Sequence, residues 1–351
     1  MQTTSVARPD SLSAQSTLPK VLISILNWNG ARKTVKCLQS MENELDFGAA
    51  VTVLVIDNGS REDDVALLAE QMPSTAVLKR LPVNLGFTGG HNVAIDIALK
   101  EGYDFIWLLN NDAVVAPGCL RELVNSMLQD QACGAVSPVL RDLDDGHIVR
   151  CVNTHDWKAR QSRRIASVEE AQRLQAVEPA SVWVDGTAVL FRVAALAQVG
   201  PLDDRLFAYF DDNDIGTRLS NRGWYSRCAF NASVFHENRK HFRDFPLYLI
   251  YLYQRNEMLF YYKNTPVQNR PLLWLKLIDE AFFYANRLER NGYPAQSRAI
   301  LLAMQDFVFH KFGPPAHERK VPVLTRLASK LAGRLYTKKL ASMPPLPPAH
   351  G

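Results

Sequence analysis

Asp112 is the first carboxylate in the sequence whose position suggests chemistry. It follows an apolar run, Phe105–Leu109, and precedes a helix expected near Pro117. A carboxylate in that position can hold a divalent cation, Mg²⁺ or Mn²⁺, against phosphate oxygens, because both ions prefer oxygen ligands. The structural alternative is a side chain that caps the approach to the helix.

A second acidic group follows a run of aromatic residues. Asp211, Asp212 and Asp214 crowd together at what looks like a helix start, and Gly223 ends that helix. Acidic residues favour a helix N-terminus, which is the simplest explanation of the cluster. Asp214 and Arg218 stand four residues apart, a spacing that predicts an ion pair. Asp211 and Asp212 are then left for proton transfer.

The elements that position these residues alternate between strands and helices. Strands expected at 21–26 and 51–56 are apolar without polar alternation, which is typical of strands buried on both faces of a parallel sheet. Further strands are expected at 76–81 and 105–109, and helices at 31–41, 64–72 and 91–100. This rhythm predicts βαβ units and an α/β fold with a mostly parallel sheet.

Polar residues follow four of these strands, where such sheets bind their ligands. The strand ends read Asn27-Trp-Asn29-Gly30, Asp57-Asn-Gly-Ser60, Asn84-Leu-Gly86-Phe-Thr-Gly-Gly90 and Asn110-Asn111-Asp112. Each alone is ordinary turn chemistry, but four in succession predict one polar rim. The glycine-rich loop could present N–H groups to a phosphate, yet it fits neither the dinucleotide-binding nor the P-loop pattern. His236, at the end of a short strand from Ser233, is either a structural hydrogen-bonding residue or a ligand.

Composition narrows the class of protein further. The chain has 351 residues with a net charge of +4 from 40 basic and 36 acidic residues, so we expect no nucleic-acid partner. Five scattered cysteines without a C-x-x-C pair indicate neither disulfides nor a zinc site. With no apolar leader and no uncharged run of about 18 residues, we expect a cytoplasmic protein without a membrane span.

Taken together, these motifs resemble the family 2 inverting glycosyltransferases, in particular their bacterial rhamnosyltransferase-like branch. The order and spacing match over roughly residues 20–260, and the resemblance also includes Gly186, Gly200-Pro-Leu-Asp203, Gly223-Trp224 and Tyr253-Gln-Arg255-Asn256. Three departures stand out. Asp211-Asp212 replaces the usual Glu-Asp, Asn110 replaces an acid of the metal motif, and Ala94 replaces a common glycine.

The resemblance implies a GT-A fold that binds a nucleoside diphosphate sugar, a dTDP- or UDP-sugar. It also implies Asp212 as general base beside Asp211, and a divalent cation held by Asp112 and His236. Asp57 would recognise the base, since a carboxylate can accept the imide N–H of uracil or thymine. The other expected donor-binding residues are Asn27, Asn29, Asn84, Gly86, Gly90, Asn92 and Asn111, and those expected on the acceptor side are Gly186, Arg255 and Asn256.

The predicted domain organisation has five parts. These are a flexible tail (1–18), the GT-A catalytic domain (19–243), a helical extension packed on it (244–318), a basic amphipathic helix (319–340) and a Pro-rich tail (341–351). In the amphipathic helix an apolar stripe runs beside a basic one, formed by Leu324, Leu327, Leu331 and Leu335 and by Arg326, Lys330, Arg334 and Lys338. That layout suits either an anionic membrane surface or packing against the domain with a solvated basic edge.

The sequence therefore predicts a glycosyltransferase that moves a sugar, rhamnose from dTDP-rhamnose, to a cell-surface polysaccharide or a lipid-linked glycan, in the cytoplasm or peripherally on the inner membrane. One alternative is a sugar nucleotidyltransferase. That class usually carries a Gly-rich, basic loop after the first strand, where this chain has Asn27-Trp-Asn-Gly30. The other is a non-catalytic glycan-binding protein of the same fold, against which the acids at 112 and 212 argue.

Overall fold

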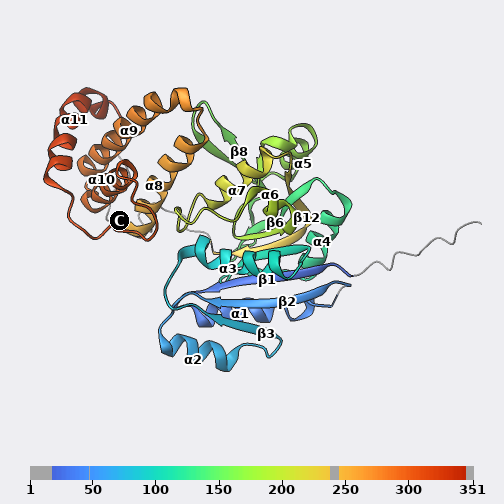
Figure 1. The fold of residues 1–351 in the computed structure, drawn as a ribbon. Coiled ribbons are helices and arrows are strands. Elements are labelled where there is room, and N and C mark those ends of the chain that lie inside the picture. Colours follow the sequence, from blue (N-terminus) through green and yellow to red (C-terminus); the bar gives the residue numbers. More distant parts are fainter. Residues whose placement is uncertain (1–17, 47, 238–244, 345–351) are drawn as a thin grey trace, which may run out of the picture.

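The protein is an α/β structure with a group of helices at one side (Figure 1). The computed structural model describes residues 18–46, 48–237 and 245–344. Its main sheet, nine-stranded within these residues, runs in the order β3 (Ala76–Arg80), β2 (Ala50–Asp57), β1 (Lys20–Asn27), β4 (Phe105–Asn110), β11 (Ala188–Arg192), β6 (Cys133–Asp142), β12 (Tyr225–His236) and β5 (Val114–Val115), with β7 (Ile148–Arg150) paired to β6. The first four strands are parallel to one another, as predicted.

Helices cover both faces of this sheet, because its strands are apolar on both sides. Along β1, Val21, Ile23 and Ile25 face one core and Leu22 faces the other. The first core also receives α1 (Ala31–Ser40), α2 (Glu62–Gln71) and α4 (Cys119–Gln129). The second receives α3 (Gly86–Lys100), α5 (Val168–Val177), α6 (Val193–Val199) and α7 (Asp211–Ser220). The predicted layered α/β class is confirmed.

A small antiparallel sheet lies above the end of the main sheet and contacts the C-terminal helices. It consists of β10 (Val182–Trp183), β8 (Val152–Asp156) and β9 (Gln161–Ile165). His155 stacks on Trp183 with ring centroids 5.0 Å apart, and its ring also lies 5.2 Å from that of Phe260 in α8 (Leu247–Asn264). These aromatic contacts join the small sheet to the helical part.

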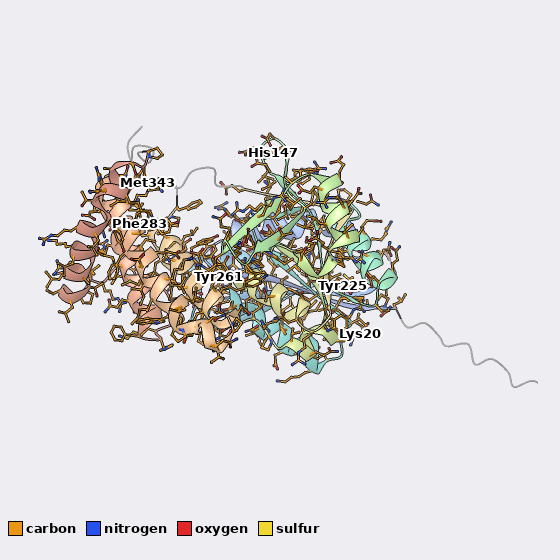
Figure 2. All side chains as sticks on the ribbon, turned by 90° about the horizontal axis from the view of Figure 1, so that it is seen from above. Lys20, His147, Tyr225, Tyr261, Phe283 and Met343 are labelled. Carbon is orange, nitrogen blue, oxygen red and sulfur yellow. The ribbon has the colours of Figure 1, made fainter. Side chains whose placement is uncertain are left out.

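The C-terminal helices form a third core of their own. They are α8, α9 (Arg270–Arg290), α10 (Pro294–Val308) and α11 (Val323–Ala341). Leu206 and Phe210, from the loop before α7, belong to this core together with residues of α8 to α10. Figure 2 shows Tyr261 of α8 where the helices meet the α/β part. The predicted boundary at 243 stays a prediction, although a core shared across it means that the two parts fold against each other.

Most predicted elements are present, with shifted ends. The last strand, expected over four residues, extends back to Tyr225, and its pairing with β6 is irregular between Ala229 and Ser233. Helix α3 begins at Gly86 rather than His91, α10 ends at Val308, and α11 begins after Pro322. The flexible tail up to residue 17, the expected helix start at residue 244 and the Pro-rich tail from residue 345 lie outside the described residues.

Candidate active site

A cleft of about 1530 Å³ runs between the α/β part, the small sheet and the C-terminal helices. Asp112 and His236 line this cleft, as do Asp211, Asp212 and Gly186. The structure thus brings together, in one cleft, the predicted metal ligands and the predicted general base, although 100 residues of chain separate the two aspartates.

Asp112 and His236 are direct neighbours. The Oδ1 atom of Asp112 lies 3.0 Å from Nε2 of His236, and its Oδ2 lies 3.6 Å from Nζ of Lys33. Burial alone would raise the pKa of Asp112, but the hydrogen bond and charge of His236 and the charge of Lys33 outweigh it and lower that pKa. Asn110 lies 3.4 Å from the same imidazole nitrogen. One carboxylate and one imidazole, both in the cleft, form a donor set that fits a divalent cation completed by phosphate oxygens.

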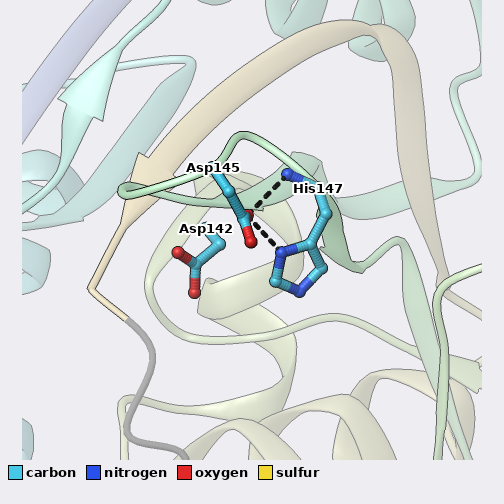
Figure 3. A group of neighbouring side chains, drawn as sticks. All are labelled: Asp142, Asp145 and His147. Atoms are coloured by element: carbon cyan, nitrogen blue, oxygen red, sulfur yellow. Dashed lines mark hydrogen bonds and ion pairs between the residues drawn. The ribbon is translucent and has the colours of Figure 1, made fainter.

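A different group of side chains brings three metal-binding atoms together. Asp142 is the last residue of β6, and Asp145 and His147 lie in the turn that leads to β7 (Figure 3). One ligand atom of each residue lies within 4.8 Å of those of the other two. Asp145 accepts hydrogen bonds from both the backbone and the ring of His147, and Asp142 accepts one from the backbone N–H of Asp144. These bonds are typical of a polar turn, and the group does not include the predicted ligands.

Asp211 and Asp212 open helix α7 beside Gly186. Asp212 Oδ1 accepts a 2.8 Å hydrogen bond from the Asn213 N–H, and Oδ2 accepts a longer one of 3.4 Å from the Gly186 N–H. Burial is the main reason that the pKa of Asp212 is raised. Burial, followed by the charge of Asp212, raises the pKa of Asp211 to about 8. In such a pair one carboxyl stays protonated while the other carries the charge.

The third acid of the group, Asp214, is structural. It is almost fully buried, and its carboxylate contacts the Nε atom of Arg218 at 2.9 Å, which confirms the predicted ion pair. Its other oxygen lies 2.6 Å from Nζ of Lys263 in α8, which also contacts Asp203 at 2.8 Å. Lys263 therefore connects the C-terminal helices to the helix that carries Asp212. No local sequence pattern marks this long-range contact.

The loop before α7 has an unusual backbone that Arg255 and Asn256 hold in place. Phe207, Tyr209 and Phe210 have φ angles of 64°, 68° and 66°, a left-handed region that is costly for bulky residues. Asn256 Nδ2 donates to the carbonyls of residues 206, 208 and 209 at 2.7–3.0 Å. Arg255 donates to the carbonyls of residues 205, 206 and 313.

Both Arg255 and Asn256 are fully buried, and neither lines the cleft. Their polar atoms are used by backbone carbonyls, and they support the loop that delivers Asp211 and Asp212. Their expected place on the acceptor side stays a prediction.

The residues expected to recognise the base lie at the ends of β1 and β2. Asn27 and Asp57 are both fully buried, and the amide of Asn27 donates to Asp57 at 3.1 Å and to Asp64 at 2.9 Å. Asn29 is held through Ser60, whose hydroxyl accepts from its N–H at 2.9 Å. The structure brings these predicted residues together outside the cleft defined above. Base recognition by Asp57 stays a prediction.

The remaining predicted donor residues pack the surrounding loops. Asn84 Oδ1 accepts from the N–H of Gly86 at 2.7 Å, and a Cβ at Gly86 would lie 2.3 Å from the carbonyl oxygen of Phe207. At Gly90 a Cβ would lie 2.4 Å from a methyl carbon of Leu26. Close packing therefore accounts for both glycines. Asn92 bonds to the backbone of Leu202, and Asn111 donates to Thr34 Oγ1 at 2.9 Å.

Cationic residues that no sequence motif indicated also line the cleft. Arg150 on β7 forms an ion pair with Asp185, and both line the cleft near Asp212. Burial, followed by the charge of Arg164 on β9, lowers the pKa of Arg150 to about 10. Tyr253 of α8 also lines this region, and burial raises its pKa. In the sequence, the only hint of these cationic residues is the pair of arginines in the short segment Gln161–Ile165.

A comparison with protein families agrees with this geometry. The family described as "Glycosyltransferase like family 2" matches residues 19–247, well over half of the chain. The chain belongs to this glycosyltransferase family. Helices α9 to α11 lie beyond the matched segment, whereas the cleft residues Asp112, Asp212 and His236 lie within it.

Known relatives and solved structures add to this assignment. Over 205 residues the chain is 27% identical to an N-acetylglucosaminyl-diphospho-decaprenol L-rhamnosyltransferase of Mycobacterium tuberculosis, covering 53% of this chain and 66% of the relative, just under two thirds of its length. The fold resembles that of S. aureus TarS in complex with UDP-GlcNAc, with 11% identity, 92% and 88% of the two chains covered and a TM-score of 0.52. It also resembles that of GalNAc-T7 with UDP, GalNAc and Mn²⁺, with 15% identity, 95% and 59% covered and a TM-score of 0.52.

These comparisons confirm two predictions, the family and the GT-A fold. Across the described parts of the chain, none of the helices combines the length and the apolar character needed to cross a bilayer.

Proposed function

We propose that the protein is an inverting glycosyltransferase that moves a sugar from a nucleoside diphosphate to a hydroxyl group. The observation that carries the proposal is the single cleft lined by the Asp112–His236 pair and by the Asp211–Asp212 pair. An inverting transfer needs a site for the diphosphate and a base on the opposite face of the sugar, and these two pairs provide one group for each. Membership of glycosyltransferase-like family 2 supports the proposal.

Asp212 is the proposed general base. The acceptor hydroxyl loses its proton to the Asp212 carboxylate as its oxygen forms a bond to the anomeric carbon, and the bond from that carbon to the diphosphate breaks. The nucleoside diphosphate leaves with the electron pair of the broken bond. A base is most effective when its pKa approaches the working pH, and burial raises the pKa of Asp212 in that direction.

Asp211 is the proposed protonated member of the acidic pair, which leaves the negative charge on Asp212. With a pKa of about 8, Asp211 is mostly protonated at neutral pH, so the pair carries a single negative charge, placed on Asp212. A Cβ at Gly186 would be in ordinary contact with both aspartates, 3.4 Å from Asp211 Oδ2 and 3.6 Å from Asp212 Cβ, so the glycine leaves the place of that one carbon open beside the pair. We assign this space to the acceptor hydroxyl.

Asp112 and His236 are the proposed ligands of a divalent cation. The donor set fits such an ion, as their 3.0 Å separation and shared exposure to the cleft indicate. When bound, the cation would neutralise charge on the departing diphosphate. Lys33, 3.6 Å from Asp112, is positioned to add a positive charge on the same side. The Mn²⁺ bound in the GalNAc-T7 structure supports cation use by this fold.

For the substrates, we propose a dTDP- or UDP-sugar as donor, with dTDP-rhamnose first, and a lipid-linked or polysaccharide glycan as acceptor. The M. tuberculosis relative is named as a rhamnosyltransferase acting on a diphospho-decaprenol acceptor, and TarS was solved with UDP-GlcNAc. Arg150 and Arg164 would place positive charge where an acceptor that carries phosphate enters the cleft. We expect this reaction at the cytoplasmic side of the membrane.

The test is a donor panel with the purified full chain. The chain is incubated with dTDP-rhamnose and with UDP-, dTDP- and GDP-linked sugars, with Mn²⁺ or Mg²⁺ or with EDTA, and sugar transfer and release of nucleoside diphosphate are measured. Release of nucleoside diphosphate from one donor supports the proposal. Formation of a nucleotide sugar from a sugar 1-phosphate and a nucleoside triphosphate would indicate a nucleotidyltransferase instead. Binding of a glycan without turnover of any donor would indicate a non-catalytic protein.

A further inference from the structure

Helix α11 is attached to α9 through one narrow face. Asn286 of α9 donates to the backbone carbonyl of Ser329 at 3.0 Å and to its hydroxyl at 3.2 Å. A Cβ at Gly333 would lie 2.2 Å from Oδ1 of the same Asn286, so the two helices touch closely there. Tyr336 donates to Asp279, and Leu340 is buried. The spacing of 329, 333, 336 and 340 places all four residues on one side of the helix.

The leucines of α11 lie on the opposite side. Leu324, Leu327, Leu331 and Leu335 are 81%, 52%, 60% and 84% exposed. At 3.6 residues per turn, their stripe is centred roughly 165° away from the attached face. The sequence left open whether these leucines pack on the domain. The structure shows that α11 packs through other residues and leaves its leucines exposed.

A row of positive charge borders the leucine stripe. Arg326, Lys330 and Arg334 are exposed, as is Lys338. By helix geometry this row is centred roughly 85° from the leucines, on one side only. Lys339 does not belong to this row, because its Nζ atom lies 4.4 Å from the centre of the Phe283 ring, on the side of α9.

We infer that α11 binds an anionic membrane surface, lying in the plane of the interface with its leucines inserted among the lipid head groups and its basic row against their phosphates. The role of this membrane binding rests on the proposed function, because binding through α11 would bring the cleft to a lipid-linked acceptor. Membrane binding itself requires no catalysis and is tested separately.

The choice of occupant follows from charge complementarity. Four basic side chains beside one apolar stripe attract an anionic surface, and each adds about 1 kcal/mol near such a surface. Their aliphatic stems can lie along the apolar boundary while the charged ends reach phosphate groups. The helix has no acidic residue between Val323 and Ala341, so nothing on it repels lipid phosphates. A second copy of the chain would instead bring two identical basic rows together, which is unfavourable.

The experiment is sedimentation of the full chain with vesicles of phosphatidylethanolamine and phosphatidylglycerol, compared with vesicles of phosphatidylcholine alone. One variant replaces the four stripe leucines with Ser, and a second replaces Arg326, Lys330 and Arg334 with Gln. Matched controls make the same kinds of change at exposed positions on the α/β part, Leu128→Ser with Val177→Ser, and Lys36→Gln with Lys79→Gln and Lys100→Gln. Circular dichroism and transfer to a short soluble acceptor monitor folding.

We expect the wild type and both controls to bind the anionic vesicles, and high salt to weaken that binding. The leucine variant should lose sedimentation. The charge variant should bind about 100-fold more weakly, the product of about fivefold for each charge. Equal sedimentation of wild type and leucine variant, or no preference for anionic vesicles, would overturn the inference. So would a wild-type dimer in sedimentation equilibrium that the leucine variant abolishes. A folded chain that binds vesicles but transfers no sugar would contradict the proposed function and leave this inference standing.

Discussion

Replacing Asp212 with Asn should separate catalysis from folding. The Asp212→Asn variant keeps an oxygen that can accept the 2.8 Å bond from Asn213, and it weakens only the 3.4 Å contact with Gly186. A bond that long contributes little, so we expect a stability change below about 1 kcal/mol. Losing the base should lower kcat by about 10²–10⁴, equivalent to about 3–5 kcal/mol of activation free energy. Activity should therefore fall far more than stability.

The assay is steady-state transfer at several pH values, with donor affinity measured separately by calorimetry. In the wild type, kcat/KM should fall as pH drops through the pKa of Asp212, which burial places above its ordinary value, because the base becomes protonated. The variant should lose this acidic limb and keep its donor affinity. The exposed Asp96→Asn serves as the matched control and should change neither quantity. Wild-type turnover by Asp212→Asn would refute the assignment and redirect it to Asp211.

Three further outcomes follow from the site. Mg²⁺ or Mn²⁺ should tighten binding of a nucleoside diphosphate to the wild type, and Asp112→Asn should remove that effect, whereas equal affinity in EDTA and in metal for the wild type would contradict it. Asp211 binds a proton in the folded protein up to a pH of about 8 but ionises near pH 4 when unfolded, so stability should fall as pH rises across that window. Thermal melts of Asp211→Asn should show a shallower slope, because only the raised pKa of Asp212 then contributes to it. Lys263→Met leaves the buried Asp214 with one partner and should cost about 1–3 kcal/mol in urea unfolding, and no loss would show that Arg218 alone suffices.

Sequence patterns correctly predicted the features of the structure that depend on neighbouring residues, namely buried strands, their polar ends and one ion pair within a helix. The apolar runs around Ile23 and Val53 identified two buried parallel strands, and the end of each parallel strand then placed the polar residues along one edge. The spacing of Asp214 and Arg218 predicted their ion pair. In each case the interacting groups lie on one element, or on elements whose mutual arrangement follows from a right-handed crossover.

Contacts between segments that are far apart in the sequence could not be predicted from such local patterns. Arg150 of β7 pairs with Asp185 in the loop between β10 and β11, and neither residue has a sequence neighbour that indicates the other. The left-handed backbone at Phe207 could not be predicted from the sequence either, because aromatic residues rarely adopt this conformation and tertiary contacts impose it here. The roles expected for Arg255 and Asn256 came from the family resemblance, and only the three-dimensional structure shows that both side chains are buried.

The hydrogen bonds from Arg255 and Asn256 to the loop before α7 make the catalytic domain dependent on the C-terminal helices. A catalytic domain that ended before α8 would lose the Asn256 amide, which binds three backbone carbonyls of that loop. It would thereby lose the support for three aromatic residues with left-handed backbone in the four positions before Asp211. The C-terminal helices are therefore part of the support of the acidic pair and not an independent module. A chimera that exchanges them must carry α8 together with the loop that its Arg255 and Asn256 hold, or Asp211 and Asp212 lose their position.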